Sequence, residues 1–147
     1  MQDMISRSST AVASLPPVCS VWIVDDTPAV LLLASHAFTR AGWRVTEFED
    51  LHSARTALAT LAAPDAVVLD VHLPDGSGLD EVSVFAAAGS AVMVVSNLAG
   101  GEHRQRALAS GAFDIATKPL DMRKLVEQLD GAVGRHHLLG GTSGTGS

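Results

Sequence analysis

A short apolar run that ends in a carboxylate constrains this chain more than any other feature of its sequence. Residues 66–71 read Ala-Val-Val-Leu-Asp-Val, and an apolar run rich in β-branched residues is typical of a strand buried on both faces. Pro74 breaks the strand, and Gly76 and Gly78 allow the following loop to turn. We therefore expect Asp70 at the end of a rigid strand, beside a flexible loop. Taken alone, an aspartate in this position is most simply a cap for the turn.

Short apolar runs alternate with helical patterns along the chain. The expected strands cover residues 21–24, 43–48, 66–71, 91–95 and 113–117. The spacing of apolar residues predicts helices at residues 30–39, 53–61, 79–88, 102–110 and 122–133. Thr27 and Asp121 are suited to cap the first and the last of these helices. Five strands that alternate with five helices predict an α/β fold, a doubly wound parallel sheet with helices on both faces.

Composition limits the partners and the environment of the chain. A length of 147 residues is enough for one domain with a substantial core, and a hydrophobic content of 47% argues against global disorder. The net charge of -6 disfavours nucleic acid as a partner. The apolar runs are too short to span a bilayer, so we expect no membrane association. Cys19 is the single cysteine, which excludes an internal disulfide and suits a cytoplasmic location.

The two ends of the chain lack this alternation. Residues 1–18 are rich in serine and small residues and contain no apolar segment of signal-peptide length, so we expect a flexible N-terminal tail. Residues 136–147 are rich in Gly, Ser and Thr and are expected to form a flexible C-terminal tail. The folded domain is therefore expected at residues 19–135, with too few residues after it for an output domain.

Polar residues follow the expected strands at the points where these strands end. They are Asp25, Asp26, Asp70, Ser96 and Lys118. Because the carboxyl ends of parallel strands meet at one edge of a doubly wound sheet, we expect these side chains to converge. Three neighbouring carboxylates repel one another unless a cation lies between them, and Mg²⁺ is the natural candidate because it prefers oxygen ligands. With a hydroxyl and an ammonium group close by, this edge is suited to bind a small anion such as a phosphoryl group.

Short motifs around these residues resemble those of one known family. They are Val-Asp-Asp at residues 24–26, Leu-Asp-Val-His-Leu-Pro at 69–74 followed by Gly78, Val-Ser at 95–96, and Gly111-Ala112 leading to Lys118-Pro119. In this order and spacing, residues 19–135 resemble the receiver domain of two-component response regulators, in its single-domain, chemotaxis-receiver-like form. The resemblance implies a flavodoxin-like fold with the strand order 2-1-3-4-5.

The resemblance also implies roles for the acidic residues and for one neighbour. Asp70 is expected to be the phosphoryl acceptor and to belong to the set of residues that bind Mg²⁺. Asp26 is expected to bind the metal directly, and Asp25 to hold a water molecule that is bound to it. His72 is expected to offer its backbone carbonyl to the same ion.

Two further residues are implied to act on the phosphoryl group. Ser96 is expected to donate a hydrogen bond to it, and Lys118 to pair with Asp70 and with a phosphoryl oxygen. One position departs from the family pattern, because Ile115 stands three residues before Lys118, where the family usually carries Tyr or Phe. That aromatic ring normally moves together with the Ser or Thr, and we expect this movement to be missing here.

The remaining histidines have no spacing that is typical of a transition-metal site. His36 and His52 are expected on helices with partial exposure, and His103 is expected near the start of a solvated helix. We expect structural or incidental roles for these residues and for His136 and His137.

Three hypotheses on function follow. In the first, a histidine kinase or histidine phosphotransfer protein phosphorylates the domain, which then contacts a downstream protein through the face built from residues 102–110, 113–117 and 121–133. Such a domain is no enzyme beyond its own phosphorylation and slow dephosphorylation. The second hypothesis is a receiver-like binding module that works without phosphorylation, which Ile115 leaves open. The third is a small phosphatase with Asp70 as nucleophile, although no general acid is evident.

Overall fold

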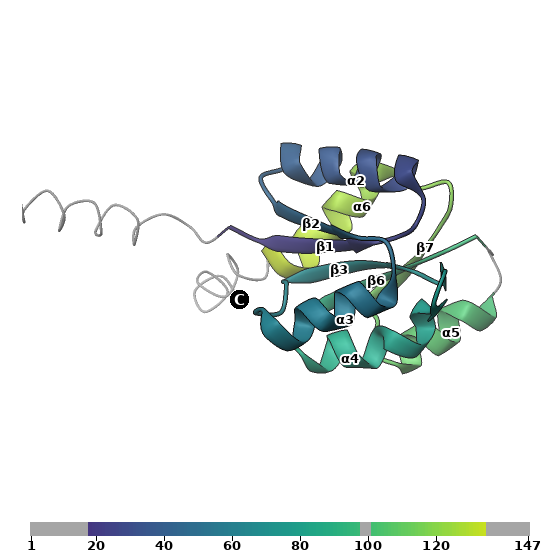
Figure 1. Ribbon diagram of the computed structural model, residues 1–147. Coiled ribbons are helices and arrows are strands. Elements are labelled where there is room, and N and C mark those ends of the chain that lie inside the picture. Colours follow the sequence, from purple (N-terminus) through teal and green to yellow (C-terminus); the bar gives the residue numbers. More distant parts are fainter. Residues whose placement is uncertain (1–17, 98–100, 135–147) are drawn as a thin grey trace, which may run out of the picture.

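The predicted parallel sheet forms from the five apolar runs. A computed structural model describes residues 18–97 and 101–134. The strands are β1 (Ser20–Val24), β2 (Arg44–Phe48), β3 (Ala66–Asp70), β6 (Ala91–Ser96) and β7 (Asp114–Thr117), and all neighbours are parallel. Their order is β2-β1-β3-β6-β7 (Figure 1), which is 2-1-3-4-5 when these five strands are counted along the chain. The predicted fold class and strand order are therefore confirmed.

Residues 1–17, 98–100 and 135–147 lie outside the described part of the chain. The two flexible tails expected at residues 1–18 and 136–147 therefore stay predictions. In the part that the structure describes, every helix is too short or too polar to cross a bilayer.

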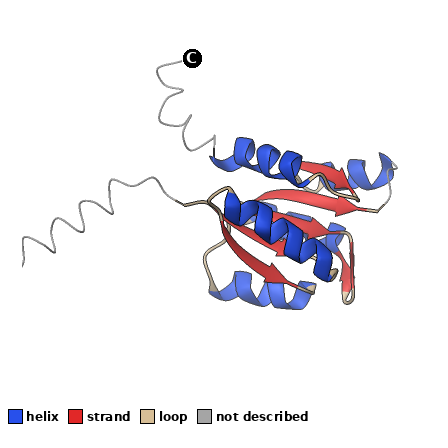
Figure 2. Cartoon of the chain, turned by 90° about the horizontal axis from the view of Figure 1, so that it is seen from above, coloured by secondary structure: helices blue, strands red, loops and turns tan. Residues whose placement is uncertain are grey.

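Helices cover both faces of the sheet, as the alternating pattern predicts. One face carries α2 (Pro28–Arg40) and α6 (Met122–Leu129), and the opposite face carries α3 (Leu51–Thr60), α4 (Val82–Ala87) and α5 (Gly101–Ala109). Figure 1 shows the two layers above and below the sheet, and Figure 2 shows the same arrangement from above. The central strands are consequently shielded from water on both sides.

The core is divided into two clusters because side chains alternate along the central strands. On β1, Val21 and Ile23 pack with residues of α2 and α6, whereas Trp22 and Val24 pack with residues of α3 and α4. The strands β3 and β6 follow the same alternation. All five residues of β3 are buried, which explains why the four residues before Asp70 are apolar and show no polar alternation.

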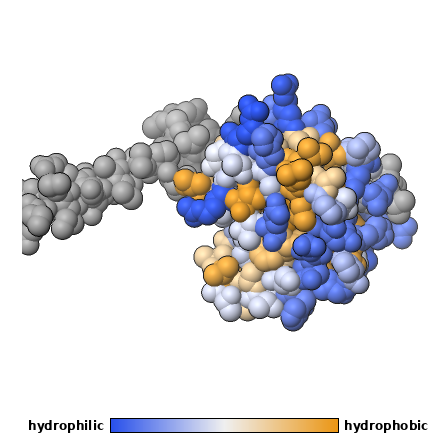
Figure 3. All heavy atoms as spheres, turned by 45° about the horizontal axis from the view of Figure 1, so that its top comes forward, coloured by the Kyte–Doolittle hydropathy of each residue, from blue (hydrophilic) through white to orange (hydrophobic). Residues whose placement is uncertain are grey.

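Some large apolar side chains stay outside the core. On α2, Leu32 is 69% exposed and Leu33 is 55% exposed. In Figure 3, where the side of the molecule that carries α2 comes forward, apolar groups lie among hydrophilic ones. Scattered apolar residues of this kind are common on protein surfaces and by themselves indicate no binding site.

Two predicted helices have different ends from those expected. The helix expected at residues 79–88 begins as a 3₁₀ turn, η1 (Gly78–Glu81), and continues as α4. The helix expected at residues 122–133 is α-helical to Leu129 and then widens into a π turn, η2 (Asp130–Gly134). Helix ends are the least predictable part of a helix, because apolar spacing fixes the buried face and leaves the last turns undetermined.

The predicted cap of the first helix is wrong in its chemistry. Thr27 is the N-cap residue of α2, but its side chain makes no capping hydrogen bond. The Asp25 Oδ1 atom instead accepts a hydrogen bond from the Thr27 amide at 2.8 Å. Pro28 takes the first helical position, where its missing N–H is no loss. At the last helix the prediction is confirmed, because the Asp121 side chain accepts a hydrogen bond from the Lys124 amide at 3.1 Å.

The loop after β3 is a small hairpin instead of the flexible loop that its sequence suggests. It pairs β4 (His72–Leu73) with β5 (Gly76–Ser77) in antiparallel fashion. Between them, the Asp75 carboxylate accepts hydrogen bonds from the amides of Leu51 and His52, each at 2.9 Å. These bonds lower the pKa of Asp75. The hairpin is thus held on the N-terminus of α3, where unpaired amides favour an anion.

Gly78 follows this hairpin and lies against the backbone of Asp70. Its amide donates a hydrogen bond to the Val71 carbonyl at 2.8 Å. A Cβ atom on Gly78 would lie only 2.1 Å from the Asp70 carbonyl oxygen and 3.1 Å from Cγ of Leu69. Because the first distance is far inside van der Waals contact, a residue with a side chain here must displace the end of β3.

We predict that Gly78→Ala destabilises the domain by about 1–3 kcal/mol, the usual cost of forcing an extra carbon into a packed site. Denaturant unfolding measures this difference. Gly131→Ala is the matched control, because a Cβ on Gly131 meets no atom within 4 Å. Its effect should stay within about 0.5 kcal/mol. Equal free energies of unfolding for the two variants would show that a Cβ atom next to the Asp70 carbonyl does not destabilise the domain.

Candidate functional site

Backbone hydrogen bonds hold the residues that follow the strands at the carboxyl edge of the sheet. The Asp25 amide donates to the Phe48 carbonyl at 3.0 Å, which extends the pairing of β1 with β2 beyond Val24. In the same way, the Val71 amide bonds to the Val95 carbonyl at 2.9 Å. The Lys118 amide bonds to the Ser96 carbonyl at 2.8 Å. The ladder therefore continues past the strands and fixes the backbone from which the polar side chains extend.

Three carboxylates meet at this edge, as the sequence predicts. Asp25, Asp26 and Asp70 each place an oxygen within 4.8 Å of the others. Asp25 and Asp70 are each only 2% exposed, whereas Asp26 is exposed to solvent. At this separation two unit charges repel by roughly 3 kcal/mol when the effective dielectric constant is about 20. The cluster therefore needs positive charge nearby.

Lys118 supplies part of that charge. Its Nζ atom lies 3.1 Å from Asp25 Oδ2 and 3.3 Å from Asp70 Oδ2, and its side chain is 16% exposed. Burial alone would lower the pKa of Lys118, but the hydrogen bond to Asp25 and the charges of Asp70 and Asp25 outweigh burial and raise it. The ammonium group is therefore firmly charged and joins the ends of β1 and β3 to the residue that follows β7.

The negative charge of Asp70 is only partly compensated by its neighbours. Burial raises its pKa, and the charge of Asp25 raises it further, although Lys118 and a hydrogen bond from the His72 amide act in the opposite direction. That amide donates to Asp70 Oδ1 at 3.3 Å. One oxygen of Asp70 thus faces the backbone of the hairpin and the other faces Lys118.

The donor set of this cluster fits a hard dication. Carboxylate oxygens are the ligands that Mg²⁺ prefers, and it usually binds through only one or two of them together with water. Asp25, Asp26 and Asp70 are the described residues that combine the required donors and proximity. The contribution expected from the His72 backbone carbonyl stays a prediction. Its side chain is exposed.

Ser96 ends β6 next to this cluster and is bonded to a residue that sequence analysis missed. Its side chain is fully buried, and its Oγ atom lies 2.9 Å from Nδ1 of His103. His103 sits in the first turn of α5, and its ring centroid lies 6.2 Å from that of His72. The sequence predicts the position of His103 near the start of this helix but not its contact with Ser96. The sequence gives only one indication of this contact: His103 is a polar residue at the start of the helix that follows β6, the strand that Ser96 ends.

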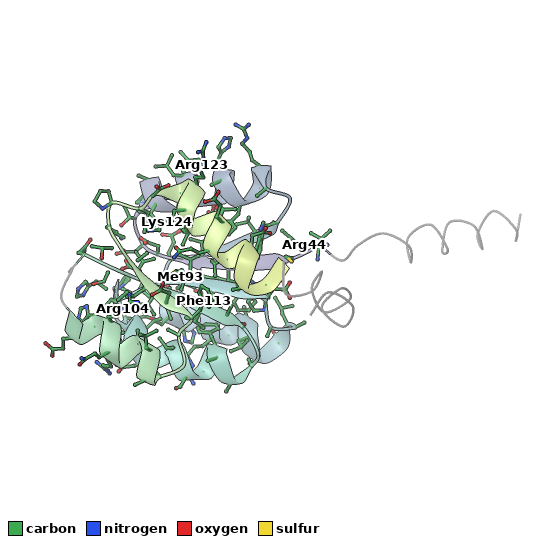
Figure 4. The ribbon with its side chains drawn as sticks, turned by 180° about the vertical axis from the view of Figure 1, so that it is seen from behind. Arg44, Met93, Arg104, Phe113, Arg123 and Lys124 are labelled. Carbon is green, nitrogen blue, oxygen red and sulfur yellow. The ribbon has the colours of Figure 1, made fainter. Side chains whose placement is uncertain are left out.

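The environment of Ile115 agrees with the departure noted in the sequence. Ile115 is half-buried in β7 and packs against the core cluster on the α3–α4 side of the sheet. Phe113 precedes β7 and is 46% exposed. Figure 4 labels Phe113 among the side chains of this region. The position of Ile115 therefore offers neither a ring nor a hydroxyl group.

The family model of the response regulator receiver domain matches residues 21–130. This match covers most of the chain. The chain belongs to the response regulator receiver domain family.

Similar proteins and structures agree with this assignment. The probable transcriptional regulatory protein TcrX of Mycobacterium tuberculosis is 37% identical over 112 residues, which are 75% of this chain and 47% of TcrX. The regulatory protein KdpE of Escherichia coli is 34% identical over 119 residues, covering 80% of this chain and 52% of KdpE. The chain thus spans about half the length of the curated relatives that it matches.

A solved structure extends the comparison to three dimensions. The BeF3-activated receiver domain of DrrB, a protein of Thermotoga maritima, has a TM-score of 0.69 and 26% identity, covering 78% of this chain and 96% of that domain. This receiver domain shares the parallel sheet with helices on both faces. The receiver family thus accounts for the described fold.

We predict that Asp70→Asn raises the melting temperature of the metal-free protein at pH 7. The folded chain holds the Asp70 proton more tightly than the unfolded chain, because the pKa of Asp70 lies above its ordinary value of 3.8. Stability is therefore lost as pH rises from 3.8 through that raised pKa, and asparagine cannot ionise. The gain should vanish in acid below pH 3.8. Thermal unfolding in EDTA across this range measures it.

Asp26→Asn serves as the comparison for this prediction. Asp26 belongs to the same cluster but is exposed, so water already screens its charge. Its substitution should raise the melting temperature less than Asp70→Asn does. A melting temperature of Asp70→Asn equal to that of the unmodified chain at pH 7 would contradict the raised pKa.

Proposed function

We propose that Asp70 accepts a phosphoryl group from a histidine kinase or a histidine phosphotransfer protein. The domain then signals by contact with a downstream protein. One observation carries the proposal: Lys118 bonds to both Asp25 and Asp70 inside a cluster of three carboxylates. In this arrangement the nucleophilic oxygen of Asp70 lies next to a fixed cation, the Lys118 ammonium group. The neighbouring carboxylate oxygens can bind a second cation. It is suited to bring a negatively charged phosphoryl group against a negatively charged acceptor.

The reaction follows from the chemistry of the two partners. An oxygen of the Asp70 carboxylate attacks phosphorus in the phosphohistidine of the donor protein, and a P–O bond forms. The P–N bond breaks, and its electron pair returns to the imidazole, which takes up a proton. The Lys118 ammonium group stabilises the charge that spreads over the phosphoryl oxygens. Water later hydrolyses the acyl phosphate, so the signal decays.

Asp25, Asp26 and Asp70 would hold the Mg²⁺ ion that the receiver family generally binds. The ion supplies positive charge to the phosphoryl oxygens during transfer. Ser96 donates a hydrogen bond to the phosphoryl group, and the His72 backbone carbonyl completes the protein ligands of the ion. These roles are supported by the oxygen-only donor set of the cluster and by the position of Ser96 at the end of β6.

The downstream partner contacts the face built from α5, β7 and α6. A hollow of about 360 Å³ opens on this face, and its lining includes Arg104, Asp114, Asp121, Lys124 and Leu125. Figure 4 shows Arg104 and Lys124 on the two helices that flank β7. Charges of both signs around an apolar residue favour a partner of matching charge pattern. We place the phosphorylation reaction in the cytoplasm.

The proposal concerns the receiver part alone. The names of the curated relatives describe regulators of transcription, and this chain spans about half of their length. Regulation of transcription is a property of those whole proteins. What this domain shares with them is the aligned stretch, 112 residues in TcrX and 119 residues in KdpE.

Treatment with acetyl phosphate and Mg²⁺ should add one phosphate to the chain, as measured by intact mass. The added mass should be absent in Asp70→Asn, because the attacking oxygen is lost, and absent in EDTA, because the phosphoryl oxygens are then poorly neutralised. Asp75→Asn is the control for a nearby carboxylate that points away from the cluster toward α3. An unchanged yield in Asp70→Asn would contradict the assignment. No added mass in the unmodified chain would favour a receiver-like module that works without phosphorylation.

Lys118→Ala should slow phosphorylation of Asp70 by about a hundredfold, the usual effect of removing one positioned group that stabilises transition-state charge. The rate is measured by quenching the reaction at intervals and determining the mass. Lys124→Ala is the matched control, since Lys124 is exposed on α6 and lines the hollow instead of the carboxylate cluster. Equal rates for the two variants would mean that the site is misplaced.

A further inference from the structure

The helix α5 is weakly anchored in the core. Its sequence Gly-Glu-His-Arg-Gln-Arg-Ala-Leu-Ala contains one buried residue, Ala107, and His103 is half-buried. The other residues of the helix are exposed. Because local stability follows the apolar surface that an element buries, α5 belongs to the parts of the domain that move at low cost.

Polar contacts therefore have unusual weight in holding α5. Arg104 forms an ion pair with Asp114 at 2.9 Å, and Arg106 forms another with Asp80. The side chains of both arginines are more than half exposed, and exposed ion pairs contribute little. The contact between His103 and Ser96 is different because Ser96 is fully buried. Of these three contacts, it is the one that leads to the proposed phosphorylation site.

A phosphoryl group on Asp70 would change the surroundings of Ser96. The strands β3 and β6 are neighbours, with Asp70 in register with Val95, the residue before Ser96. The new anion adds strong acceptors next to this hydroxyl group. A serine hydroxyl has a single proton to donate. Whichever of the two groups donates in the contact between Ser96 and His103, the geometry of that contact changes when the Ser96 hydroxyl group turns toward the phosphoryl oxygens.

Ile115 in β7 offers no polar route from the site. Ile115 has an apolar side chain that packs in the core and makes no side-chain hydrogen bond. It therefore cannot follow Ser96 through a polar contact. His103, in contrast, already connects Ser96 to the first turn of α5.

We propose that His103 couples phosphorylation of Asp70 to the position of α5 through its hydrogen bond with Ser96. This inference rests on the proposed function and adds to it the residue that carries the change out of the site. His103 is a positioning residue, because it acts through Ser96 and takes no part in the transfer. The face that contacts the downstream protein includes α5, so the coupling reaches that surface.

Hydrogen exchange of α5 with and without BeF3⁻ and Mg²⁺, a mimic of the phosphoryl group, tests this coupling. In the unmodified chain, peptides within residues 101–109 should change their exchange rate by about threefold or more on binding. In His103→Leu that change should disappear, while calorimetry still shows one bound BeF3⁻. His103→Asn should keep it, because the amide places a donor and an acceptor near the position of Nδ1.

Two further variants separate coupling from a structural role of His103. Arg106→Gln removes an exposed ion pair of α5, so exchange should change little in either state and the response to BeF3⁻ should remain. Ser96→Ala should abolish the response, and adding His103→Leu to it should change nothing more. A full response in His103→Leu, or a loss in Arg106→Gln equal to that in His103→Leu, would overturn the coupling alone. A failure of the unmodified chain to bind BeF3⁻ would overturn the proposed function, and the coupling with it.

Discussion

The ion pairs of Lys118 with Asp25 and Asp70 are the interactions on which the rest of the site depends. They join the ends of β1 and β3 to the residue after β7, so that elements far apart in the sequence meet around one ammonium group. Three carboxylates and one lysine leave an excess of two negative charges at the edge of the sheet. Burial of Asp25 and Asp70 makes that excess costly. The same excess makes the edge suited to bind a dication and, with it, a phosphoryl group.

The fold places these charges by means of its backbone. Asp25 and Lys118 follow strands whose ladders continue for one more hydrogen bond, whereas Asp70 and Ser96 are the last residues of their strands. Gly78 lets the chain return closely across the carbonyl of Asp70, and Asp75 holds the hairpin on α3. Asp70 therefore stands on a rigid strand with a supported loop beside it. Preorganisation of this kind keeps the charges in place before any partner arrives.

The sheet and the carboxylate cluster could be predicted from the sequence, because local patterns of apolar and polar residues determine both. The buried run 66–71 and the polar residues after the strands specify the sheet and the cluster, because parallel strands share one carboxyl edge. The contact between His103 and Ser96 could not be predicted in this way. It depends on how the first turn of α5 is turned toward β6, and a helix that buries only Ala107 has almost no apolar pattern to fix that rotation. Thr27 shows the same limit, since its expected cap is replaced by a carboxylate from the preceding turn.

The two helices that flank β7, α5 and α6, differ in how much apolar surface they bury. This difference decides which of them moves more easily when the site changes. The helix α6 buries Leu125 and Leu129 in the same cluster as Phe38 and Ile23, so displacing it would disturb the centre of the core. In α5, one alanine is buried and much of the attachment is polar. Of the two helices that flank β7, the one with less buried apolar surface moves at a lower cost in free energy. We therefore expect a new charge at Asp70 to displace α5, while α6 stays in place.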